Sequence, residues 1–186
     1  LGMLFGMWMT ARKHKMPYVW WLDRIMIPVT IGGALVRLGN LMNSEIVGRV
    51  TDVPWAFQFV RLPPNMPIES IPAQHPAQLY EALCYIITFV ILCVMYYKFD
   101  VGRHKPGIMF GVGVMGVFFT RPFIEMVKMN QEAFEANMFL NMGQLLSLPF
   151  ILLGLFMIAR SLMRPEVLDV NAVVAHAISE YKREDK

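Results

Sequence analysis

An arginine and an asparagine at the end of one apolar run have the types and spacing to bind a phosphate. Arg37 and Asn40 follow the run 25–36 and lie three residues apart, so on a helix they share one face. A planar guanidinium can donate two parallel hydrogen bonds to a phosphate, and the carboxamide would face the same ligand. Ionisable groups are costly where a membrane-spanning helix reaches the headgroups, so we expect Arg37 to serve a ligand. The alternative is that it only anchors the helix end by extending to the interface.

Other polar residues fall near the ends of the remaining apolar runs. Arg121 and Glu125, for example, lie four residues apart and therefore on one helical face. Isolated charges that face lipid would cost about 2.5 to 3.5 kcal/mol each, so we expect one shared cavity, open to the outer leaflet. Two arginines in it predict an anionic ligand. The polar residues expected at this depth are Arg37, Asn40, Glu45, His75, Gln78, Glu81, Arg121, Glu125, Asn141 and Gln144.

Each of these groups also has a purely structural interpretation. Arg121 and Glu125 have the spacing of an intrahelical ion pair. Glu81 follows Pro76 closely enough to be a carboxylate in the first turns of a helix, where it suits the helix dipole. Asn141 and Gln144 could bridge neighbouring helices, and His75 could be a loop histidine.

The composition is typical of a membrane protein. Of 186 residues, 56% are hydrophobic and 17% are charged, and the mean hydropathy is +0.46. The formal net charge is +3, and the basic residues form short clusters between apolar runs, which argues against a nucleic-acid partner. Cys84 and Cys93 lie in one apolar segment and indicate no disulfide framework. We find no metal-ligand spacing, phosphate-binding glycine loop or serine nucleophile motif, so no metal and no cofactor is expected.

The apolar runs predict an all-α fold, a polytopic transmembrane helical bundle with a long outward-facing loop region. The first run, 1–9, is expected to be the tail of a spanning helix, so the chain would be an N-terminally truncated piece of a longer protein. The positive-inside rule places the basic segments 10–15 and 99–106 in the cytoplasm. The transmembrane domain would cover 1–163, with full spans at about 18–42, 79–97, 107–127 and 140–160, an outer loop at 43–78 and a cytoplasmic tail at 164–186.

Prolines dominate the long outer loop. They exclude a long helix from 51–78, and within it the segment 55–60 is expected to be a short strand or an interfacial segment. Long ordered loops often carry function.

Four segments resemble the motifs of bacterial prolipoprotein diacylglyceryl transferases. Residues 37–49 resemble the family's arginine-isoleucine-glycine-asparagine signature, and 75–81 resemble its histidine-proline-serine-glutamine-leucine-tyrosine-glutamate motif. Residues 121–125 are similar to its arginine-phenylalanine-x-x-glutamate motif, and 142–149 to the motif of its last helix. The four occur in the family's order, so the resemblance covers nearly the whole chain before the tail.

The resemblance implies an enzyme that transfers diacylglyceryl from phosphatidylglycerol to a lipobox cysteine. The acceptor thiol belongs to the signal peptide of a preprolipoprotein, glycerol phosphate is released, and the active site faces the periplasm from the bacterial inner (cytoplasmic) membrane. Partners would be this lipid, the preprolipoprotein and the bilayer. Arg37 and Arg121 would bind the phosphodiester and stabilise charge on the leaving phosphate, while Glu45 and Glu125 would hold the arginines or the glycerol hydroxyls. The implied catalytic residues are Arg37, Arg121, Glu45 and Glu125, and the implied phosphatidylglycerol-binding residues are Arg37, Asn40, Asn43, Gly48, Arg121, His75 and Gln144.

The chain departs from the family pattern at several positions. Val36 and Ser44 stand where the family usually has glycine, Pro122 follows the second arginine, and Val117 stands where a tyrosine is common. The resemblance also implies that a histidine-glycine-glycine segment and two crossings precede Leu1 in the whole protein, so the piece alone is expected to be inactive.

Two other classes of function fit the same polar groups. A membrane transporter or anion pathway would also place ionisable residues inside the membrane, but it needs polar lining at both depths. The cytoplasmic halves of 79–97 and 140–160 are almost wholly apolar, which favours lateral access by a lipid. A non-catalytic assembly subunit would tolerate lysine in place of Arg37 and Arg121.

Overall fold

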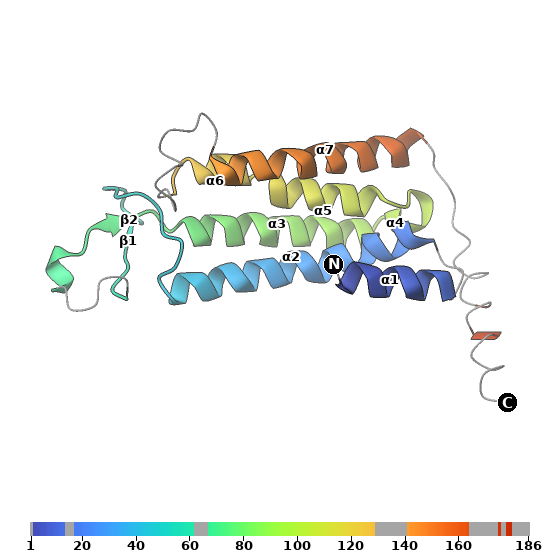
Figure 1. The fold of residues 1–186 in the computed structure, drawn as a ribbon, viewed down its shortest axis with the longest axis horizontal. Helices are drawn as coiled ribbons and strands as arrows, with labels where there is room; N and C mark the ends of the chain where they lie inside the picture. The colour runs from blue at the N-terminus through green and yellow to red at the C-terminus, as the bar shows by residue number, and fades with distance from the viewer. Residues whose placement is uncertain are drawn as a thin grey trace.

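Long apolar helices form the body of the protein. The computed structural model describes residues 2–13, 17–61, 67–128 and 141–163, together with 175, 178 and 179. Within these ranges, candidate membrane spans are α2 (Tyr18–Met42), α3 (Ala77–Tyr97), α5 with α6 (Ile108–Phe118 and Arg121–Glu125) and α7 (Met142–Met163). They lie side by side along the long axis of the molecule (Figure 1). The all-α class predicted from the sequence is confirmed.

Short elements lie at the two ends of this bundle. Strands β1 (Phe57–Gln58) and β2 (Ala73–Gln74) pair antiparallel, with Phe57 opposite Gln74. They extend beyond the end of the bundle where α2 ends and α3 begins, together with the 3-10 helix η1 (Ile68–Ser70) (Figure 1). Helix α4 (Val101–His104) lies at the opposite end, and α1 (Gly2–Lys13) packs against α2.

Several boundaries differ from the sequence expectation. Helix α1 continues through Thr10–Lys13, which was expected to leave the membrane as a loop, because this segment contains good helix formers and neither glycine nor proline. Helix α3 begins at Ala77, directly after Pro76 at its N-cap. The sequence also predicts a short polar outer loop at 128–139, and of this loop only Lys128 is described. The tail 164–186 lies outside the described residues, except 175, 178 and 179.

The third full crossing consists of two helices joined by a short turn, and together residues 108–125 have the length and hydropathy of the single span predicted from the sequence. Helix α5 ends at Phe118, and α6 begins at Arg121 after a turn at Phe119 and Thr120. Pro122 explains the break, because a proline has no N–H to donate to the carbonyl four residues earlier and its ring collides with that carbonyl. Phe119 and Thr120 nevertheless keep right-handed helical φ/ψ angles, so the chain passes from α5 to α6 without leaving the helical region.

Glycines allow α5 to pack directly on its neighbours. A Cβ atom added at Gly116 would lie 2.3 Å from the Thr88 hydroxyl of α3, and one at Gly111 would lie 2.9 Å from the Gly154 carbonyl of α7. Small residues of this kind let membrane helices approach closely. The bundle therefore places α3 and α7 on α5 at fixed depths.

A buried carboxylate fixes the start of α5 to α2. Asp23 is fully buried and accepts hydrogen bonds from the backbone N–H groups of Gly107 (2.6 Å) and Phe110 (2.8 Å). The first N–H groups of a helix have no partner within the helix, so a carboxylate there satisfies them and suits the dipole. This contact sets the height of α5 relative to α2.

Candidate functional site

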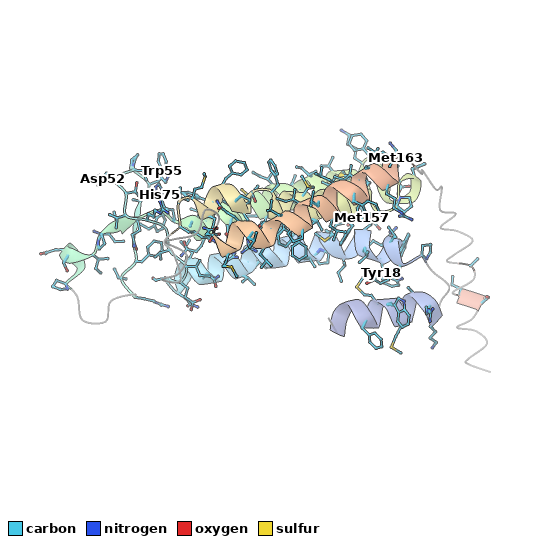
Figure 2. All side chains as sticks on the ribbon, turned by 45° about the horizontal axis from the view of Figure 1, so that its top comes forward. Tyr18, Asp52, Trp55, His75, Met157 and Met163 are labelled. Atoms are coloured by element: carbon cyan, nitrogen blue, oxygen red, sulfur yellow. The ribbon has the colours of Figure 1, made fainter. Side chains whose placement is uncertain are left out.

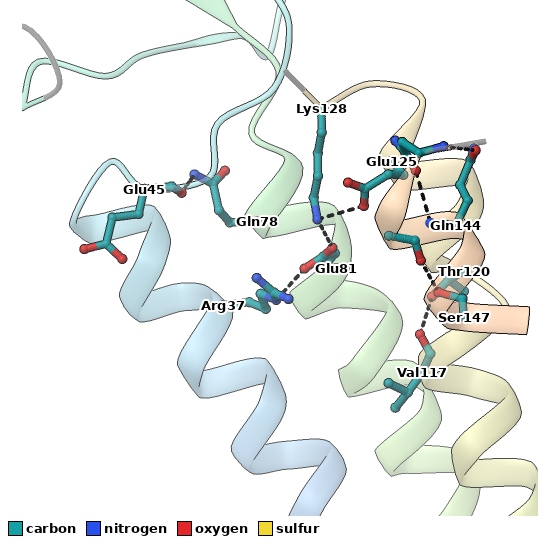
Figure 3. A network of polar contacts seen from close by, with 12 residues as sticks. Arg37, Glu45, Gln78, Glu81, Val117, Thr120, Glu125, Lys128, Gln144 and Ser147 are labelled. Atoms are coloured by element: carbon teal, nitrogen blue, oxygen red, sulfur yellow. Dashed lines mark hydrogen bonds and ion pairs between the residues drawn. The ribbon is translucent and has the colours of Figure 1, made fainter. Parts of the chain in front are cut away.

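A buried ion-pair network connects three helices at the loop end of the bundle. Glu81 of α3 is fully buried, and its carboxylate forms ion pairs with Nε of Arg37 on α2 and with Nζ of Lys128, at 2.6 Å. Lys128 Nζ also lies 3.3 Å from a carboxylate oxygen of Glu125 on α6. Figure 3 shows these side chains converging on Glu81. The two contacts to Glu81 lack hydrogen-bond alignment, so opposite charge holds them together.

The charges of this region do not cancel. Arg37 and Lys128 are balanced by Glu81 and Glu125, and Arg121 adds a third cation, which leaves one net positive charge. Buried charges are costly unless they are paired. An unbalanced cation at this depth therefore favours an anionic ligand.

Arg121 is the cation whose donors are least occupied. It is the first residue of α6, its Nε atom is buried, and that atom has no hydrogen-bond partner in the described part of the chain. The described residues show no ion pair between Arg121 and Glu125, because Glu125 contacts Lys128. The guanidinium lies 5.9 Å from the centre of the Phe118 ring. Its unused donor is available to an anion.

Tyr85 connects the two predicted arginines. It lies one turn after Glu81 on α3, and its hydroxyl is close enough to Arg37 for the two side chains to interact electrostatically. The same hydroxyl interacts electrostatically with Arg121. Arg37 and Arg121, which come from different crossings, thus face a common region around Tyr85.

The start of α7 packs against the Glu125 carboxylate. A Cβ atom added at Gly143 would lie 2.7 Å from the carboxyl carbon of Glu125, so the absence of a side chain there makes room for the acid. The first turn of a helix has unpaired N–H groups and a partial positive charge, and this stabilises a nearby carboxylate. Glu125 is therefore held between Lys128 and the start of α7.

Gln144 is engaged in holding α7 in place. Its backbone N–H donates to the side-chain oxygen of Asn141 (3.0 Å), and the Asn141 backbone N–H donates to the side-chain oxygen of Gln144 (3.3 Å). This is the reciprocal arrangement of a capping box. The Gln144 amide nitrogen also donates to the Pro122 carbonyl at 3.1 Å, which joins α7 to α6.

The chain that follows α2 turns the Glu45 side chain away from the network. Ser44 and Ile46 both have positive φ angles, of 59° and 58°. As a result, the Glu45 carbonyl accepts a hydrogen bond from the Gln78 side chain, whereas the Glu45 carboxylate is exposed and points away from Glu81 (Figure 3). Arg37 is therefore held by Glu81, whereas the sequence predicted Glu45 as one of the acids that could hold an arginine.

The remaining polar residues of this turn lie at the end of α2. Asn40 is half-buried, and its carbonyl accepts a hydrogen bond from the Glu45 N–H at 2.9 Å. Asn43 is exposed at the C-cap, and its N–H donates to the Gly39 carbonyl. Both side chains therefore remain at the edge of the site, one turn and two turns beyond Arg37.

Gly48 allows the loop to pass between α3 and α6. Its N–H donates to the His75 carbonyl (2.9 Å), and the next N–H, of Arg49, donates to the Val127 carbonyl (2.8 Å). A Cβ atom at Gly48 would lie 2.5 Å from both the His75 carbonyl oxygen and the His75 Cβ. Gly48 also forms a β-bridge with Lys128. The close approach of these segments thus sets the position of Lys128.

The His75 ring faces the loop. Its Nδ1 atom lies 3.1 Å from the Tyr80 hydroxyl, which accepts a hydrogen bond from the Trp55 indole at 2.8 Å. Figure 2 shows Trp55 and His75 together beyond the end of the bundle, with Met163 at the other end. The backbone of His75 supports Gly48, and its ring belongs to the loop cluster.

Sequence reasoning missed the centre of the network. The sequence predicts Glu81 in the shared polar cavity, with a helix-dipole carboxylate as the alternative, but assigns it no catalytic or binding role, and it assigns none to Lys128. A signal for Glu81 was its position as an ionisable residue in a nearly apolar span, which usually marks function. A signal for Lys128 was its spacing of three residues from Glu125, which is the spacing of an ion pair in a helix or helical turn.

Comparisons with known proteins identify relatives of this chain. A sequence profile described as prolipoprotein diacylglyceryl transferase matches residues 1–160. A Porphyromonas gingivalis protein named phosphatidylglycerol–prolipoprotein diacylglyceryl transferase is 41% identical, over 89% of this chain and 61% of the relative. A Bacteroides fragilis protein of the same name is 42% identical, over 84% of this chain and 53% of the relative. A Chloroherpeton thalassium protein of the same name is 36% identical, over 90% of this chain and 60% of the relative.

These matches confirm the resemblance drawn from the four motifs, although the chain spans only 53% to 61% of the length of these three relatives. The match to the profile extends from the first residue through nearly all of α7. It therefore includes every described residue of the ion-pair network. The chain belongs to the prolipoprotein diacylglyceryl transferase family.

Proposed function

We propose that this chain carries the phosphatidylglycerol-binding site of an enzyme that transfers diacylglyceryl to the lipobox cysteine of preprolipoproteins. The observation that carries the proposal is Arg121, a cation beyond the charge-balanced buried network, whose buried Nε has no hydrogen-bond partner in the described part of the chain. The headgroup of phosphatidylglycerol presents an anionic phosphodiester of matching charge. The names of the relatives support the same lipid and the same class of protein substrate.

The reaction requires stabilisation of charge on a leaving phosphate. The cysteine sulfur attacks the carbon of the diacylated glycerol that carries the phosphate. A C–S bond forms, and the bond between this carbon and the phosphate oxygen breaks, with its electron pair remaining on the glycerol phosphate that leaves. A free thiol with a pKa of about 8.5 is mostly protonated at neutral pH, so its proton must be removed as it reacts. Arg37 and Arg121 would donate hydrogen bonds to the phosphate oxygens as their charge increases.

The other acidic and amide groups support this arrangement in different ways. Glu125 and Glu81 hold the cations, while Asn40 and Asn43, at the end of α2, would contact the glycerol part of the headgroup. Glu45 would reach the same region from the exposed turn. Gly48, His75 and Gln144 contribute to the site by fixing the loop and the start of α7.

The proposed orientation places this site toward the periplasm of a bacterial inner membrane. The end of the bundle opposite the ion-pair network carries the basic ends of α1 and α7, with Arg12 and Arg160 (Figure 1). Lys98 lies at the same end, at the C-cap of α3. Basic residues favour the cytoplasmic side, so the network would open to the outer leaflet.

A chimera provides the direct test of this function. This chain replaces the matching part of the Porphyromonas gingivalis relative, and the purified chimera is incubated with phosphatidylglycerol labelled in its acyl chains and a lipobox peptide. The expected result is label on the peptide with equimolar release of glycerol phosphate, and no label on a control peptide whose cysteine is replaced by serine. A folded chimera that labels neither peptide would refute the proposed function.

A further inference from the structure

We propose that Lys128 is a positioning residue, the counterion that leaves Arg37 free to bind the lipid phosphate while Glu81 stays paired. This inference rests on the proposed function and concerns the same site. It assigns to Lys128 a role in lipid binding that acts through Glu81.

Lys128 is placed where it contacts both acids of the network. Its side chain is 4% exposed, and its Nζ atom lies 2.6 Å from Glu81 and 3.3 Å from Glu125. These contacts join α3 to the short segment that follows α6 (Figure 3). Lys128 thus connects the part of the site that holds Arg37 with the part that follows Arg121.

The backbone holds Lys128 at this point independently of its ion pairs. Gly48 pairs with it in a β-bridge, and the Arg49 side chain donates a hydrogen bond to its carbonyl at 3.1 Å. The N–H of Lys128 donates to the Glu125 carbonyl at 3.3 Å. The lysine is therefore directed inward by main-chain contacts.

Glu81 would otherwise compete with the phosphate for Arg37. A fully buried carboxylate with a single cation nearby binds it strongly, because charge is poorly screened away from water. Lys128 contacts the Glu81 oxygen that Arg37 does not, so the acid remains paired when Arg37 turns donors toward a ligand. Arg37 can therefore turn from Glu81 to the phosphate without leaving a buried carboxylate unpaired.

The same residue sets the net charge that the ligand meets. The described network has one net positive charge, from Arg37, Lys128 and Arg121 against Glu81 and Glu125. Lys128→Met lowers this charge to zero. Adding Glu81→Gln returns it to one positive charge and removes the acid that competes for Arg37.

The test measures transfer kinetics in the chimera for Lys128→Met, Lys128→Arg, Glu81→Gln and the double variant Lys128→Met with Glu81→Gln. Lys98→Met is the matched control, because Lys98 is exposed at the other end of α3. We expect Lys128→Met to raise the KM for phosphatidylglycerol at least about fivefold and to leave the KM for the lipobox peptide within about twofold. Lys128→Arg should stay within about threefold of wild type, because it keeps the charge.

The double variant separates a counterion from a residue that only supports the fold. It should have a lower KM for phosphatidylglycerol than Lys128→Met, and it should accumulate in membranes even if Lys128→Met does not, because removing both partners of a buried pair costs less than removing one. An unchanged KM for phosphatidylglycerol in Lys128→Met would overturn the proposal. So would a double variant whose KM for phosphatidylglycerol is as high as that of Lys128→Met, or a double variant without transfer activity. Absence of transfer by the wild-type chimera would refute the proposed function instead.

Discussion

Replacing Arg37 by lysine keeps the positive charge on α2 but removes the planar set of donors. The guanidinium has five N–H donors, and its Nε side faces Glu81 in an ion pair. The others are available for a phosphate and can form two parallel bonds. A lysine has three N–H donors on one atom, so it cannot face Glu81 and also present two parallel donors to one phosphate.

The expected loss follows from one missing hydrogen bond to a charged group. Such a bond contributes about 1.5 to 3 kcal/mol, which corresponds to a decrease of about 10-fold to 160-fold in kcat/KM. The effect should fall on the lipid substrate, because the lysine still balances Glu81 and preserves the fold. Arg121→Lys should cause a decrease of similar size.

The assay is the transfer of labelled diacylglyceryl to a lipobox peptide by the chimera, with rates normalised to the amount of folded protein. Arg61→Lys is the control, because Arg61 is exposed on the loop. Rates close to wild type in both Arg37→Lys and Arg121→Lys would remove the bidentate phosphate contact from the account and favour a non-catalytic subunit.

Three further substitutions test the supports of the site. Gly48→Ala places a Cβ atom 2.5 Å from His75 and should cost about 1 to 3 kcal/mol of stability, measured as a lower Tm in detergent. Gly143→Ala displaces the Glu125 carboxylate and should lower the transfer rate at least about fivefold per folded molecule. An unchanged rate would contradict a role of Glu125 in transfer. Asp23→Ala removes the acceptor at the start of α5 and should cost about 1 to 2 kcal/mol, seen in thermal unfolding. The Asp23→Ala protein that remains folded should have the wild-type KM for phosphatidylglycerol. A changed KM would contradict a purely structural role of Asp23.

Helix positions were predictable to the extent that the bilayer sets them. A span needs about 20 apolar residues, so runs of this length between basic or proline-rich segments indicated where the helices of the bundle lie. The break between α5 and α6 was not predicted, because a proline inside an apolar run is compatible with either a kinked helix or two helices. Pro28 and Pro149, by contrast, lie inside continuous helices.

The residues of the site were only partly predictable from the sequence. Arg37, Arg121 and Glu125 stood out as ionisable residues in apolar runs, and the structure brings their elements to one end of the bundle. The pairing of Glu81 with Lys128 depends on the loop that passes through Gly48, and no local pattern encodes that contact.

Glu45 illustrates the opposite case, in which a motif residue lies away from the network. Local spacing places its carboxylate within reach of Arg37, but the positive φ angles of Ser44 and Ile46 reverse the chain. The Glu45 carbonyl, and not its carboxylate, then faces Gln78 of α3. Its catalytic role stays a prediction, which Glu45→Gln in the transfer assay would test.

The position of the lipid phosphate tests the central claim most directly. An experimental structure of the chimera with phosphatidylglycerol bound should show the phosphate within hydrogen-bonding distance, about 2.7 to 3.2 Å, of nitrogen atoms of both Arg37 and Arg121. Glu81 should remain in contact with Lys128 in that structure. A phosphate bound elsewhere, or held by only one of these arginines while the other faces different surroundings, would contradict the account.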